Sequence, residues 1–131
     1  DKFGALLSAA DILLVNELPG IAEMAVPSKL TSYFAAGKPV LAATESRSAT
    51  ACEVTTSLGG VVVAGGDPEA LVHGVEMLAA DPALRARLGA AGQAFARRTL
   101  QPEVAIDSYE AWCGALMGEP RRRRIISLAA G

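Results

Sequence analysis

The sequence of 131 residues has little of several features that mark particular classes of protein. Aromatic residues make up 5% of the chain, which disfavours an aromatic-rich β-sandwich. No apolar run approaches the ~18 residues of a spanning helix, and no signal peptide is evident. Hydrophobic residues nevertheless make up 51% of the chain, enough for the buried core of one domain.

Charge and cysteine content exclude further classes of function. The chain carries 12 basic and 14 acidic residues, and four of the basic ones are Arg121–Arg124, so the remainder has a balance of 8 − 14 = −6. This acidic body predicts no binding of nucleic acid, while the arginine run is either a solvated tail or a contact for an acidic surface. Cys52 and Cys113 are far apart and lack metal-ligand spacing. We therefore expect no metal site and a reduced, cytoplasmic chain. We also expect no cofactor, and a location that is either free in the cytoplasm or peripheral at the inner face of a membrane.

Short apolar runs alternate with helical patterns along the chain. The segments at 12–15, 39–43 and 60–64 are continuous apolar runs, as in strands buried on both faces. This alternation predicts the α/β class, with a Rossmann-like parallel sheet between two layers of helices over residues 1–117 and a basic tail at 118–131. Three strands make only half of a doubly wound sheet, so the outer edge of the first strand is left unpaired. We expect this edge to pair with an upstream part of a longer parent chain or with a second copy.

Proline, glycine and capping residues set the expected helix ends. Ser28 is a candidate N-cap, Gly37 is suited to a left-handed C-cap, and Pro39 prevents the helix from continuing. Further helices are expected at 48–57, from Asp67-Pro68, from Asp81-Pro82 to about residue 98, and from Gln101-Pro102 to about residue 117.

The start of the helix at Ser28 is the strongest candidate site. It follows the loop after the first strand, and ligands of parallel sheets bind beyond the carboxyl ends of the strands. The backbone N–H groups of Ser28, Lys29 and Leu30, with the Lys29 ammonium group, would suit a phosphate. The alternative is that Ser28 is only a helix cap and Lys29 a solvated charge. No P-loop and no GxGxxG motif is present.

Other polar residues are weaker candidates. Glu17 and Glu23 flank Pro19-Gly20 in the loop after the first strand and could bind a sugar hydroxyl group or a cation. Glu45, Ser46 and Ser48 follow the second strand, although these serines are more typical of helix caps. The single histidine, His73, lies inside a predicted helix, and Cys52 has no histidine nearby to activate it.

Two long segments resemble a known enzyme family. DILLVNELPGIAEMAVPSKLTSYFAAGKPVLAA (11–43) and GGVVVAGGDPEALVHGVEMLAADPALRARLGAAGQAFA (59–96) resemble family 4 glycosyltransferases of the GT-B architecture, in particular the colanic-acid and O-antigen branch. The resemblance covers about residues 2–113. It implies that the chain is the second half of the C-terminal domain, which holds the nucleotide-sugar donor. The full enzyme would transfer a sugar from a UDP-sugar or GDP-sugar, with retention and without a metal, to a surface-polysaccharide or lipid-linked acceptor.

The resemblance also implies roles for individual residues. It places Gly20, Ser28, Lys29, Leu30 and Ser32 at the donor, with Ser28–Leu30 at its diphosphate. Many members of the family carry two glutamates separated by seven residues, and the second of them binds the ribose.

Neither of these glutamates is present at its expected position in this chain. Met24 stands at the first position and Ser32 at the second. Glu23, one residue before Met24, is the one candidate catalytic residue in the chain. Because the acceptor half of the cleft would lie upstream, we expect the isolated chain to be inactive. Two alternatives to a transferase stay open, a nucleotide-sugar epimerase of the same architecture and a non-catalytic assembly or nucleotide-sensing module.

Overall fold

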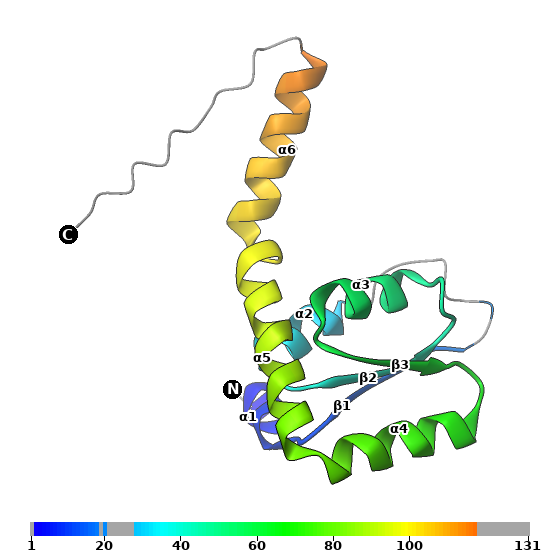
Figure 1. Ribbon diagram of the computed structural model, residues 1–131. Coiled ribbons are helices and arrows are strands. Elements are labelled where there is room, and N and C mark those ends of the chain that lie inside the picture. Colours follow the sequence, from blue (N-terminus) through cyan, green and yellow to red (C-terminus); the bar gives the residue numbers. More distant parts are fainter. Residues whose placement is uncertain (1, 19, 21–27, 118–131) are drawn as a thin grey trace. The chain divides into compact units, whose positions relative to one another are not determined.

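The computed structural model describes residues 2–18, 20 and 28–117 (Figure 1). The chain divides between Leu100 and Gln101 into two compact units. Within the described residues, no helix is both long enough and apolar enough to cross a bilayer.

The first unit contains a parallel sheet of three strands in the order β1-β2-β3. The register pairs Asn16 with Ala43 and Thr44 with Ala64. For the residues that the structure describes, the sequence therefore predicted the fold class and the three strands correctly, and β1 lies at an edge of the sheet as expected. In chain order the elements are α1 (Lys2–Ala9), β1 (Leu13–Asn16), α2 (Lys29–Ala35), β2 (Val40–Thr44), α3 (Ala49–Ser57), β3 (Gly60–Ala64), α4 (Pro68–Ala80) and α5 (Pro82–Thr99), followed in the second unit by α6 (Pro102–Leu116).

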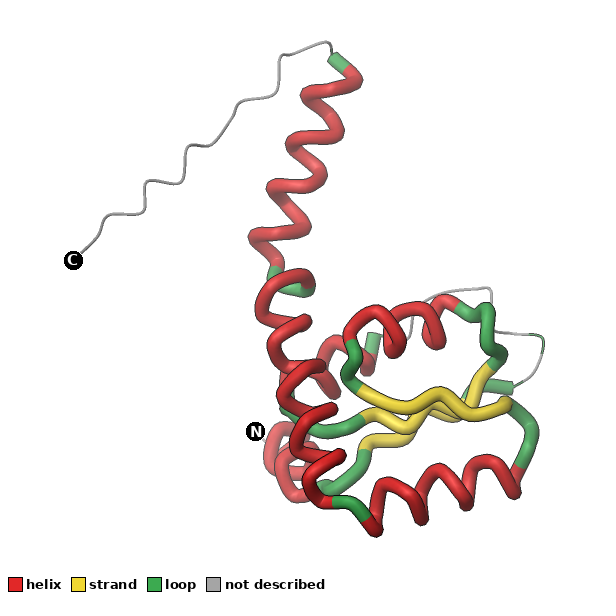
Figure 2. The backbone as a smooth tube through the Cα atoms, viewed as in Figure 1, coloured by secondary structure: helices red, strands yellow, loops and turns green. Residues whose placement is uncertain are grey.

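Helices cover both faces of the sheet, as Figures 1 and 2 show for the first unit. On one face, α2, α3 and α5 enclose a cluster of buried hydrophobic residues. On the other face α4 lies close to β2 and β3, where Gly74 allows the helix to approach Leu41 and Val63. The cluster consists of Val15, Leu30, Phe34, Val40, Ala42, Val54, Phe95 and Ala96.

Burial differs among the three strands, which corrects the prediction that all of them are buried on both faces. All five residues of β2 are buried because this strand is central. In β1 burial alternates, and Leu14 is 43% exposed because α4 lies over β2 and β3 and not over β1. The edge strand β3 is only partly buried along its length.

Most of the predicted helix ends are confirmed. The Asp67 carboxylate accepts from the N–H groups of Glu69 and Ala70 at 3.0 Å, and the Asp81 carboxylate accepts from the N–H of Leu84 at 2.8 Å. Gly37 has a φ of +68°, the left-handed conformation expected after α2.

The prediction that Ser28 caps α2 through its side chain is wrong. Its φ of −55° and ψ of −24° are helical, whereas a capping residue is extended, and its hydroxyl makes no cap hydrogen bond. Gln101 likewise precedes α6 without a side-chain cap hydrogen bond.

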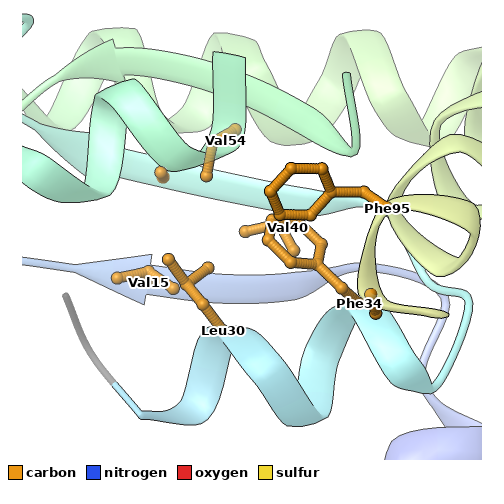
Figure 3. Close-up of a cluster of buried hydrophobic side chains, with 8 residues drawn as sticks. Val15, Leu30, Phe34, Val40, Val54 and Phe95 are labelled. Carbon is orange, nitrogen blue, oxygen red and sulfur yellow. The ribbon is translucent and has the colours of Figure 1, made fainter. Parts of the chain in front are cut away.

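Phe34 fixes α2 against α5 (Figure 3). Its ring is fully buried and meets the ring of Phe95 edge-on, with the centroids 6.0 Å apart and an interplanar angle of 77°. Gly59 and Gly92 provide the space, because a Cβ atom on either glycine would lie within 3.0 Å of the Phe34 ring. In addition, Gln93 Nε2 donates to the carbonyl oxygen of Ala35 at 3.2 Å. The last turn of α2 is therefore held firmly against α5.

Candidate functional site

The carboxyl ends of all three strands meet at one edge of the sheet, where parallel α/β sheets bind their ligands. Polar residues follow two of the strands there. Glu17 comes directly after β1, and Glu45 comes directly after β2, which itself ends in Thr44. We therefore describe this edge as the candidate site.

The Glu17 carboxylate is held by two threonines. Its Oε2 accepts from Thr44 Oγ1 and its Oε1 from Thr50 Oγ1, both at 2.5 Å, and its backbone N–H donates to the carbonyl oxygen of Ala43 at 3.0 Å. Hydrogen bonds to an ionised carboxylate are short and strong. Glu17 thus connects the end of β1 to β2 and α3, and it is less free to contact a sugar or a cation than a loop carboxylate would be.

The hydrogen bonds continue from Thr44 into α3. The hydroxyl groups of Thr44 and Ser48 are 2.9 Å apart, and Ser48 Oγ accepts from the N–H of Ala51 at 2.9 Å. Because Thr44 has a single hydroxyl proton and directs it to Glu17, Ser48 donates to Thr44. Among the described residues, no buried side-chain nitrogen or oxygen lacks a partner. This network holds the side chains at the carboxyl edge in place, so that a ligand bound there would require little rearrangement of them.

Glu45 connects the loops that follow β1 and β2. Its Oε1 accepts from the backbone N–H of Gly20 at 2.8 Å, and Gly20 has a φ of +83°, which a residue with a side chain rarely adopts. Gly20, a predicted donor-binding residue, is therefore held near the end of β2. The prediction did not include this contact.

A hollow of about 520 Å³ opens at the ends of β2 and β3. Polar groups at its rim include the exposed side chains of Ser46 and Arg47. Sequence reasoning did not single out Arg47, although its position in the polar loop after the second predicted strand could have indicated it. The lining residues are Thr44, Glu45, Ser46, Arg47 and Val62–Gly65.

A second hollow, of about 390 Å³, lies between α3, β3 and α5. Its lining is mainly apolar, unlike that of the hollow at the carboxyl edge.

The predicted residues of α2 differ in what they present to this edge. Leu30 is 1% exposed and packs toward Val15 (Figure 3), which places the first turn of α2 beside the second half of β1. Its backbone N–H, but not its side chain, is suited to contact a ligand. Ser28 and Lys29 are exposed, and Ser32 is half-buried.

Among the residues that the structure describes, none accepts a hydrogen bond from the N–H of Ser28, Lys29 or Leu30.

The other candidate residues lie elsewhere. Glu23 and Met24 lie outside the described residues. His73 and Cys52 are exposed on α4 and α3, and no group of three metal-binding side chains occurs in the described part of the chain. The structure thus leaves the donor-binding roles as predictions, with Ser28, Lys29 and Leu30 beside the carboxyl edge.

Comparison with known proteins was informative at the level of structure. No family model and no curated protein sequence matches the chain. Among solved structures, a sucrose-phosphate synthase from Thermosynechococcus elongatus is similar, with a TM-score of 0.66 and 22% sequence identity. The match covers 87% of this chain and 27% of that protein, so the chain spans about a quarter of its length. The fold of the chain is therefore similar to that of a GT-B glycosyltransferase domain.

Proposed function

We propose that the chain is the nucleotide-sugar-binding portion of a glycosyltransferase. The observation that carries the proposal is the fold: 87% of the chain superimposes on part of a sucrose-phosphate synthase with a TM-score of 0.66. The position of Ser28–Leu30 beside the carboxyl edge of the sheet, where such folds bind ligands, supports it further.

In this proposal the donor diphosphate binds at the first turn of α2. The N–H groups of Ser28, Lys29 and Leu30 donate to phosphate oxygens, and the exposed Lys29 side chain adds a full positive charge. Because α2 has only seven residues, the local N–H groups and Lys29 contribute more than the summed helix dipole. Ser32, one turn further along α2, contacts the ribose, and Gly20 brings the loop after β1 close to the donor.

The finer assignment follows the family 4 resemblance. In this assignment the reaction is a metal-independent, retaining transfer from a UDP-sugar or GDP-sugar to a surface-polysaccharide or lipid-linked acceptor, as in the colanic-acid and O-antigen branch. The donor's own phosphate assists departure of the leaving group, and Glu23 is the candidate catalytic residue of this segment. The acceptor side is provided by a further domain, so the chain by itself binds the donor without transferring the sugar.

The outer edge of β1 is proposed as a contact with further protein. The N–H of Leu13 donates to Pro39, directly before β2, and the N–H of Glu17 donates to Ala43 in β2. By the alternation of a parallel ladder, the N–H and C=O groups of Leu14 and Asn16 therefore point away from β2. A further parallel strand would pair with these groups, either from an upstream part of a longer chain or from a second copy. Size-exclusion chromatography with light scattering would distinguish the two, because only the second alternative gives a dimer of this chain.

Calorimetric titration with UDP and GDP tests the donor site. We expect one of the two nucleotides to bind the chain, and Lys29→Ala to weaken binding about 10-fold to 100-fold, since a charged hydrogen bond contributes about 1.5–3 kcal/mol. Lys38→Ala is the matched control, because Lys38 precedes β2 at the opposite edge of the sheet. Binding that both variants leave unchanged, or an absence of binding, would contradict the proposal.

A further inference from the structure

The outer edge of β3 presents backbone groups that point away from the sheet. β3 is the edge strand opposite β1 (Figure 2). The carbonyl oxygen of Gly59 and the N–H of Gly65, which flank β3, are hydrogen-bonded to β2. By the alternation of a parallel ladder, the N–H and C=O groups of Gly60, Val62 and Ala64 therefore point outward. The partner that matches a row of donors and acceptors at this spacing is a further extended backbone.

The strand β3 has none of the features that usually keep an edge strand from pairing. The segment 59–66, GGVVVAGG, contains no charged residue and no proline, which are the residues that commonly protect such edges. Valine strongly favours strands, and β3 contains three in succession. None of the five residues of β3 is buried, whereas all five residues of β2 are. An edge of this composition pairs readily with another strand.

Open space borders this edge along its length. The hollow of about 390 Å³ between α3, β3 and α5 is lined by Gly60 and Val62. The hollow of about 520 Å³ at the carboxyl edge is lined by Val62 and Ala64. The three residues with outward backbone groups therefore border one hollow or both, which leaves room for a strand beside them.

The side-chain sizes of β3 are symmetrical about Val62, which points to a second copy of this chain as the partner. A small residue, three valines and a second small residue follow one another. In antiparallel pairing about a two-fold axis at Val62, this valine meets its own counterpart, and Gly60 meets Ala64 of the second copy. These three pairs exchange two hydrogen bonds each, so 3 × 2 = 6 bonds form. Val61 meets Val63 of the second copy, which adds cross-strand pairs of β-branched side chains.

We propose that the outer edge of β3 is an interface between two copies of this chain, paired antiparallel about Val62 into one continuous sheet. The interface uses the edge strand opposite β1, beside which the first turn of α2 lies. Dimerisation and nucleotide binding therefore involve different edges of the sheet, and either proposal can fail without the other.

Light scattering of the whole chain after size-exclusion chromatography gives the first test. We expect a dimer whose fraction rises with protein concentration. Val62→Pro removes the outward N–H at the centre of the interface and keeps the ladder to β2, since an edge strand accepts proline where its nitrogen faces away from the sheet. It should weaken the dimer at least about 10-fold, because two hydrogen bonds across the two-fold axis are lost. Ala64→Pro, at an exposed position, should also weaken it.

Leu14→Pro is the matched control for the proline variants. It removes an outward N–H from β1, the other edge of the sheet, and should leave the dimer unchanged. Circular dichroism establishes that each variant keeps its secondary structure.

A disulfide between the two copies tests the register without disturbing the ladder. In a background with Cys52→Ser and Cys113→Ser, Val62→Cys should form this disulfide on mild oxidation, because hydrogen-bonded antiparallel pairs have Cα atoms about 5.5 Å apart. Ala64→Cys is the control, because Ala64 lies opposite Gly60 and four residues from its own counterpart. That offset is about 13 Å at about 3.3 Å per residue, which a disulfide cannot span.

Three results would overturn the proposal. The first is a chain that stays monomeric at every concentration measured. The second is a dimer that Leu14→Pro disrupts and the two proline variants of β3 do not, which would assign the contact to β1. The third is a disulfide that forms as readily with Ala64→Cys as with Val62→Cys, which would contradict pairing about Val62.

Discussion

A single methyl group added at Gly92 should destabilise the contact between α2 and α5. A Cβ atom at this position would lie 2.8 Å from Phe34 Cδ1 and 3.2 Å from the Cα atom of Gly59. The Phe34 ring is fully buried and has little room to move. Overpacking of this kind costs about 1–3 kcal/mol, whereas alanine gains up to about 1 kcal/mol over glycine inside a helix. We therefore expect Gly92→Ala to lower the free energy of unfolding by up to about 2 kcal/mol.

The Cδ1 atom of the Phe34 ring is the main cause of this cost, so removing the ring should reverse the effect. Phe34→Ala alone is expected to destabilise the chain by about 3–5 kcal/mol. In the Phe34→Ala background the clash between the ring and residue 92 is relieved and the higher helix propensity of alanine remains. The double variant should therefore be at least as stable as Phe34→Ala alone, with a coupling energy of about 1–3 kcal/mol.

Urea denaturation followed by circular dichroism measures all four proteins of this cycle. Effects of the two changes that add within about 0.5 kcal/mol would refute the reasoning, because residues that do not share a contact behave additively. The result also concerns the candidate site, since the packing of Phe34 positions the helix that carries Ser28–Leu30.

Two further predictions use the same urea measurement. Asp81→Ala should lower the free energy of unfolding by about 1 kcal/mol, because it removes the side-chain cap of α5. Ser28→Ala should lower it by less than about 0.5 kcal/mol, because Ser28 makes no cap hydrogen bond. Equal effects of the two changes would contradict the assignment of these caps. Thr50→Val should lower the free energy of unfolding by about 1–3 kcal/mol, because it removes one hydrogen-bond donor from the Glu17 carboxylate. Thr55→Val, at an exposed position, is the control and should change the free energy of unfolding by less than about 0.5 kcal/mol. A Thr50→Val variant as stable as the control would show that this hydrogen bond contributes little.

The local parts of the fold could be predicted from the sequence because they depend on neighbouring residues. The aspartate–proline pairs at 67–68 and 81–82 begin helices through contacts that span two or three residues. Gly37 ends α2 through its own φ angle, and the apolar runs indicate the three strands. None of these features requires knowledge of what lies across the sheet.

The remaining features depend on contacts between distant residues. Glu17 meets Thr44 and Thr50, which are 27 and 33 residues away, so a single sequence gives no direct signal for their hydrogen bonds. The exposure of Leu14 depends on which strands α4 covers, and a continuous apolar run does not contain that information. Ser28 has the residue type and position of a cap but a helical backbone conformation, which the sequence pattern alone could not predict.

The first turn of α2 is the part of the account on which the proposed function depends. Amide chemical shifts of the chain, recorded by nuclear magnetic resonance during titration with UDP and GDP, test it most directly. We predict that the largest changes occur at Ser28, Lys29 and Leu30, with smaller ones at Gly20. Changes confined to the opposite edge of the sheet, near Lys38, or no changes at saturating nucleotide, would contradict the account.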